Sequence, residues 1–130
     1  VYSLEKNDFM SLRNKILFLS QELKEELLES EDVVYLNGLW NSCVVGVLQI
    51  DAYLAMLGIL SSTKEKVIPS EAIEYIKAWL ERIRGTTQSN LKALDMPPQN
   101  LATKTQEYIQ KLKSVFMELE SLVSRELSRL

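Results

Sequence analysis

Apolar residues recur every three or four positions along most of the chain, with polar and charged residues between them. In residues 3–30 this 3-4-3-4 spacing is carried by Phe9, Leu12, Ile16, Leu19 and Leu23. It returns in residues 70–94 with Ile73, Ile76, Leu80 and Ile83, and in residues 100–129 with Tyr108, Leu112, Val115, Leu119 and Leu122. The spacing is typical of amphipathic helices that bury one face. We therefore predict three such helices.

The segment 33–63 departs from this pattern because it is apolar around most of the circumference of a helix. Asp51 is the single charged residue among its 31 positions. On a helical wheel one thin mixed stripe remains, made of Asn37, Asn41, Val44, Leu48, Asp51, Ala55, Gly58 and Ser62. We predict a helix at about 32–62 that is covered by protein more completely than its neighbours, since a helix that is hydrophobic all round is normally buried all round.

Short polar segments separate the predicted helices. The clearest is 95–100, which contains Pro97-Pro98 and ends at Asn100, a candidate cap for the last helix. Four helices of similar length with short connections favour an all-α, antiparallel up-down-up-down four-helix bundle. We predict one domain spanning residues 1–130, with helices at about 3–30, 32–62, 70–94 and 100–129.

Composition argues against most kinds of chemistry. The chain has no histidine, so His-dependent triads and Glu-x-x-His di-iron sites are excluded. Its single cysteine, Cys43, forms neither an intrachain disulfide nor a cysteine-rich zinc site, and favours a reducing, cytoplasmic setting. Four scattered glycines build no phosphate-binding or dinucleotide-binding loop. We predict no catalytic, cofactor-binding or metal site, and a protein that is not an enzyme.

Three interpretations of the apolar segment stay open. A self-contained bundle packs around it, or its outer face meets another protein or a second copy of the chain, or it spans a membrane. For the second, the candidate interface residues are Val44, Val45, Leu48 and Asp51. The third is disfavoured, because polar residues interrupt the segment and a charge near a bilayer centre costs about 2.5–3.5 kcal/mol.

Asp51 also has two interpretations. A buried carboxylate without a partner has a raised pKa and often marks a functional site. The favoured alternative is that it lies on the polar stripe, wetted or paired with an Arg or Lys of a neighbouring helix. If the bundle instead binds a ligand, we expect a small apolar molecule between the helices near Trp40, Asp51 and Tyr53.

Positive charge gathers in residues 77–113, where seven Lys and Arg stand against three Asp and Glu. Lys77, Arg82 and Arg84 form a candidate basic patch for nucleic acid or an acidic protein. The net charge of −3 gives no global attraction to nucleic acid, and solvated outer faces explain the same residues.

The favoured function is therefore a non-enzymatic protein-interaction or scaffold module that binds another protein or forms a dimer through helix-on-helix packing, as in a coiled coil. The alternatives are a ligand-binding sensory bundle and a small helical subunit of a nucleic-acid assembly.

Overall fold

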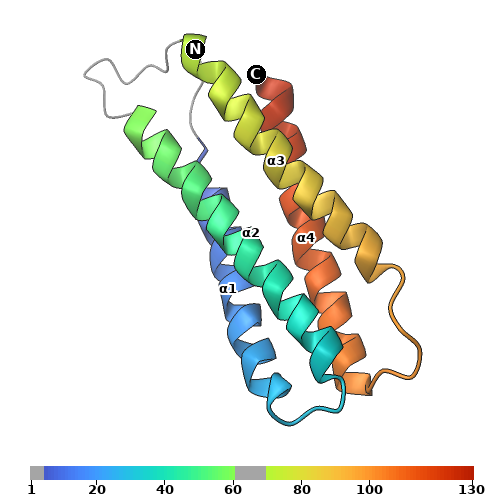
Figure 1. Cartoon of the computed structure of the whole chain (residues 1–130). Helices are drawn as coiled ribbons and strands as arrows, with labels where there is room; N and C mark the ends of the chain where they lie inside the picture. The colour runs from blue at the N-terminus through green and yellow to red at the C-terminus, as the bar shows by residue number, and fades with distance from the viewer. Residues whose placement is uncertain (1–4, 61–69) are drawn as a thin grey trace.

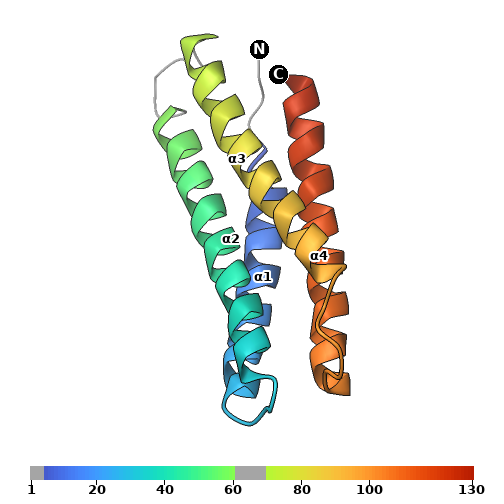
Figure 2. The same cartoon turned by 45° about the vertical axis from the view of Figure 1, so that its right-hand side comes forward.

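A computed structural model of the protein describes residues 5–60 and 70–130. Over these residues the chain forms four helices, α1 (Asn7–Leu27), α2 (Val33–Leu60), α3 (Ser70–Leu94) and α4 (Thr103–Arg129). They lie side by side with alternating direction (Figures 1 and 2). Going round the bundle, α1 contacts α2 and α4, and α3 contacts the same two helices. The predicted all-α four-helix bundle is confirmed.

The core is built from the periodic apolar positions of all four helices. In α1 the five residues of the predicted stripe are all buried. In α2 the buried apolar side chains are Leu36, Leu39, Cys43, Val47, Ile50, Tyr53 and Leu57. The ring of Tyr53 packs against Phe9 of α1, with the ring centroids 4.9 Å apart. Burial of large side chains such as these contributes about 1.5–3 kcal/mol each, which is the main force that holds the helices together.

The buried face of α4 is wider than the predicted seam. Tyr108, Leu112, Leu119 and Leu122 of the seam are buried, whereas Val115 is half-buried. Ile109, Phe116 and Val123 beside the seam are buried as well. Burying the Phe116 ring removes more apolar surface from water than burying a valine would.

The start of α4 is capped from the opposite hairpin. Asp32, which lies just before α2, accepts hydrogen bonds from the Ala102 backbone N–H at 2.9 Å and the Thr105 hydroxyl at 2.7 Å. These two bonds lower the pKa of Asp32, the Thr105 hydroxyl having the larger effect. The prediction that Asn100 caps this helix is wrong, since the cap position is Ala102. Asn100 instead has a φ of 65° and reverses the chain before the helix.

A ladder of ion pairs joins α1 to α4. Asp8 pairs with Arg125, Lys15 with Glu118, Glu22 with Lys111 and Glu26 with Lys104, at 2.9, 3.1, 3.9 and 3.1 Å. The first three pairs are one heptad apart on each helix, which is the arrangement of interhelical charges along an antiparallel coiled coil. A shift of the register by seven residues would bring like charges together, with Asp8 beside Glu118 and Lys15 beside Lys111. The ladder therefore helps to specify how the two hairpins dock.

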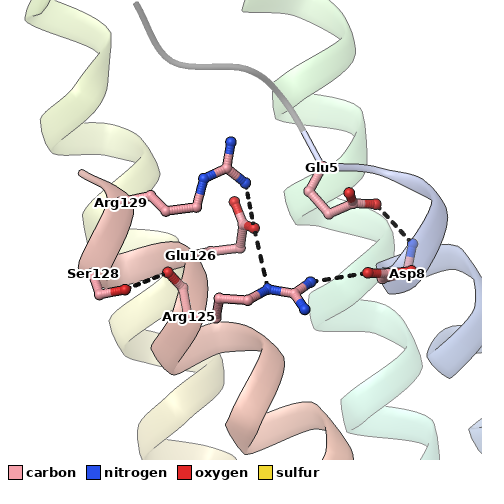
Figure 3. A network of polar contacts seen from close by, with 6 residues as sticks. All are labelled: Glu5, Asp8, Arg125, Glu126, Ser128 and Arg129. Carbon is pink, nitrogen blue, oxygen red and sulfur yellow. Dashed lines mark hydrogen bonds and ion pairs between the residues drawn. The ribbon is translucent and has the colours of Figure 1, made fainter.

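The ladder ends in the polar network shown in Figure 3. Arg125 reaches across to Asp8, whose backbone N–H donates to Glu5 at 3.0 Å. The neighbouring Glu126 carboxylate, between Arg129 and Arg125, is fully buried and accepts from Arg129 at 2.7 Å, with the Arg125 Nε 4.0 Å away. Two cations thus accompany a carboxylate that would otherwise be costly to bury.

Candidate protein-binding surface

Helix α2 exposes an apolar strip on the side opposite the core. Eight positions of this helix follow each other at alternating intervals of four and three residues. We name them the α2 strip, and they are Val34, Gly38, Asn41, Val45, Leu48, Ala52, Ala55 and Ile59. All are exposed except Ala52, which is half-buried. This spacing is the heptad repeat of a coiled-coil seam, and here it faces away from the bundle.

The large side chains of the α2 strip are well exposed. The exposed fractions are 85 % for Val34, 43 % for Val45, 61 % for Leu48 and 72 % for Ile59. Of the eleven large apolar residues exposed in the described part of the chain, five lie on α2. The others are spread over the remaining helices and loops, where exposed single residues are normal. The concentration on one helix sets α2 apart.

The structure places the predicted interface residues unequally. Val45 and Leu48 lie on the α2 strip. Val44 is half-buried, and Asp51 is turned toward α1, so neither lies in the seam. The α2 strip is therefore rotated from the mixed stripe expected from the wheel, and has Gly38, Val45, Ala52 and Ile59 in place of Asn37, Val44, Asp51 and Gly58. Ser62 lies outside the described residues.

Asp51 is held by Arg13 of α1. The Arg13 Nε donates to Asp51 Oδ1 at 2.9 Å and its Nη2 to Oδ2 at 3.3 Å, which is a bidentate pair. The hydrogen bond from Arg13 is also the main cause of the raised pKa of that guanidinium. Both side chains keep partial contact with solvent, at 27 % and 41 % exposed. Asp51 is thus a structural partner, as the favoured interpretation of the sequence expects.

A cavity adjoins the first half of the α2 strip. It has a volume of about 340 Å³ and lies between α2 and the end of α3, with Phe116 of α4 also lining it. Val34 and Gly38 belong both to the strip and to the lining of this cavity. A Cβ placed on Gly38 would meet nothing within 4 Å. The space beside Gly38, at the edge of this cavity, is therefore open.

The ligand site predicted near Trp40, Asp51 and Tyr53 does not have the expected geometry. Tyr53 points into the core against Phe9, whereas Asp51 is turned to Arg13 at the surface. The two side chains therefore face different surroundings and do not converge on one molecule. The inward-pointing Asp51 that this alternative requires is not observed.

The predicted basic residues of α3 are engaged locally. Lys77 lies 3.7 Å from Glu74, and Arg84 lies 3.8 Å from Glu81, each one helical turn away. The guanidinium of Arg82 lies over the Trp79 ring, 5.3 Å from its centroid. Acidic neighbours on the same helix thus offset two of the three positive charges.

Ionisable groups that bind metals do not gather in the part of the chain described here. Over residues 5–60 and 70–130, no three or more His, Cys, Asp or Glu side chains lie close enough to hold an ion. Cys43 is buried in the core, and this burial raises the pKa of its thiol to about 12. A thiol with so high a pKa is unreactive at neutral pH.

Among the described residues, α2 is the one helix long and apolar enough to cross a membrane, and 33 % of its most apolar window is buried in the bundle. Core helices of soluble proteins meet the same criterion, so this feature carries little weight on its own.

Comparisons with known proteins give no relative. No family model, no curated protein and no solved structure matches the chain.

Proposed function

We propose that this protein is a non-enzymatic protein-interaction module that self-associates through the α2 strip. The observation that carries the proposal is the run of eight heptad-spaced positions, which includes four exposed large apolar side chains and no charge. Because the strip has no ionisable group, it can bind a partner by apolar packing but cannot transfer protons. A second α2 strip matches it, because both faces are equally apolar and neither brings a charge that must be desolvated.

The expected strength of dimerisation follows from the exposed apolar area of the α2 strip. The exposed parts of the four large side chains amount to about two and a half whole side chains per copy. Burying them on both copies contributes roughly 8–15 kcal/mol. Association costs about 4–15 kcal/mol in lost translational and rotational freedom. We therefore expect a reversible dimer with a dissociation constant in the micromolar range or weaker.

Light scattering on a sizing column, over a concentration series, tests the proposal. The wild-type chain should shift from monomer to dimer as its concentration rises. Leu48→Glu should remain monomeric, because the dimer would bury a carboxylate without a partner. Phe18→Glu is a matched control, since Phe18 is 62 % exposed but lies on α1, outside the α2 strip. This control should dimerise like the wild type.

Circular dichroism should show that both variants keep the helical fold. A wild-type chain that stays monomeric up to millimolar concentration would contradict the proposal. A dimer that Phe18→Glu abolishes and Leu48→Glu leaves intact would also contradict it, because the interface would then lie elsewhere.

A further inference from the structure

The cavity beside Gly38 and the exposed side chain of Ile59 lie at opposite ends of the α2 strip. Val34 and Gly38 are in the first two turns of α2, and Ile59 is in the last turn. One end of the strip therefore has a hole, and the other end carries a large apolar side chain. A surface that holds both a hole and a matching knob at symmetry-related positions suits a two-fold interface, in which each copy supplies both.

We infer that two copies of this chain pair antiparallel along α2, with Ile59 of each copy beside Val34 of the other, at the end of the strip where Val34 and Gly38 line the cavity. This inference rests on the proposed self-association and adds the orientation and register of the partner.

The sequence of the strip has the symmetry that this register needs. The centre of the strip lies between Val45 and Leu48. From either end toward this centre the side chains are first large, then small, then small or medium, and then large again. In the antiparallel pairing Val34 lies beside the partner's Ile59, and Gly38 beside the partner's Ala55. Asn41 lies beside the partner's Ala52, which leaves room for water on its amide. Val45 packs against the partner's Leu48 at the centre.

The cavity distinguishes the two possible orientations. In a parallel pair each residue would face its own copy, so Ile59 would face Ile59 and both cavities would stay empty. In the antiparallel pair both cavities receive a side chain, which recovers packing contacts that an unfilled void lacks. The antiparallel arrangement also brings the N-terminus of each α2 beside the C-terminus of the other, which favours it electrostatically.

The length of the contact agrees with a reversible dimer. A helix of 28 residues extends about 42 Å. One helix-on-helix seam of this length falls at the small end of specific interfaces, below roughly 1,200 Å² in total, where transient complexes are found.

Cysteine cross-linking tests the orientation. Val34→Cys and Ile59→Cys are prepared separately, with Cys43 retained because its buried thiol has a pKa of about 12 and does not compete. A disulfide requires Cα atoms within about 7 Å. An equal mixture of the two variants should give an oxidised dimer linked from 34 to 59, and each variant alone should give little. Cross-linking of each variant with itself would indicate a parallel pair and overturn the inference.

Filling the hole is the second test. Gly38→Leu should weaken dimerisation about tenfold or more, because its side chain occupies the space in which Ala55 of the other copy approaches the helix. Gly85→Leu is the matched control, since Gly85 is also helical and exposed and a Cβ there also meets nothing within 4 Å. Both variants should fold, as thermal melts will verify.

The outcomes separate this inference from the proposed function. A monomeric wild type would contradict both. A wild-type dimer that Gly38→Leu leaves unchanged, or that forms no 34–59 link, would overturn the antiparallel register alone.

Discussion

Arg13 holds Asp51, the single charge of the apolar segment 33–63, through two hydrogen bonds of 2.9 and 3.3 Å. The pair joins α1 to α2 at the border between the core and the solvent. It agrees with the rotation of α2 that burial of its apolar side chains sets, because Asp51 faces α1 in that rotation. With Asp51 turned toward α1, Val45 and Leu48 face outward.

The contribution of the Arg13–Asp51 pair should be small but measurable. A double-mutant cycle with Arg13→Gln and Asp51→Asn should give a coupling free energy of about 0.5–1 kcal/mol, since both groups are partly solvated and the geometry is bidentate. Urea unfolding of the four proteins measures it. The same cycle at Lys15 and Glu118, an exposed single-contact pair, should give less. A coupling energy near zero would show that the rotation of α2 depends on apolar packing alone.

The cap that Asp32 provides for α4 should make stability depend on acid pH. The pKa of Asp32 is lowered by its bonds to Thr105 and Ala102. Its folded pKa therefore lies below the unfolded value of about 3.9. The stabilisation is fully present above that value and is lost as the pH falls through the lower, folded value.

Asp32→Asn should consequently lower the melting temperature at pH 7. The melting temperature of this variant should also fall less steeply than that of the wild type between about pH 5 and pH 2. Melting curves over this range measure the effect. Glu31→Gln is the matched control, since it removes the neighbouring exposed carboxylate and none of the hydrogen bonds to Thr105 and Ala102. Equal slopes for Asp32→Asn and the wild type would mean that the cap is not formed in solution.

The helices and the buried face of α1 follow from the local apolar pattern, because a strong 3-4 repeat leaves one way to bury the stripe. The orientation of α2 does not follow from its apolar pattern, because a helix that is apolar on most sides has no strongly preferred inner face. Val45 faces outward and Val44 is half-buried only once α2 packs against its neighbours in the folded bundle. The cap of α4 was equally hidden, since Asp32 lies some 70 residues before Ala102 and meets it only in the folded bundle. The heptad spacing from Val34 to Ile59 is present in the sequence itself. A helical wheel drawn at 100° per residue does not align these positions, because it assumes 3.6 and not 3.5 residues per turn.

The ion-pair ladder between α1 and α4 should respond to charge reversal. Lys15→Glu places a carboxylate beside Glu118, and should lower the free energy of unfolding by about 0.5–1 kcal/mol. Adding Glu118→Lys restores opposite charges and should recover most of the loss. The effect should shrink at 1 M salt, where the Debye length is about 3 Å. A loss that the second substitution does not recover would mean that Lys15 acts through its aliphatic stem and not through its charge.

Gly46 lies buried in the middle of α2. Gly38, Ser42 and Gly46 follow one another at four-residue intervals, and such a run of small residues allows close helix approach, but the contacts at Gly46 are of ordinary length. A Cβ on Gly46 would lie 3.8 Å from Ile16 and from Phe116, and a Cβ on Gly38 would meet nothing. Gly46→Ala should therefore be accommodated without strain.

Because alanine has the higher helix propensity, Gly46→Ala should raise the free energy of unfolding by about 0.5–1 kcal/mol. Gly85→Ala on the exposed face of α3 gains the same propensity without new core contacts, so the difference between the two variants isolates the packing at Gly46. Urea unfolding of both measures it. A Gly46→Ala variant less stable than the wild type would show that α1, α2 and α4 approach more closely here than the structure describes, and that the small residue is needed for the crossing.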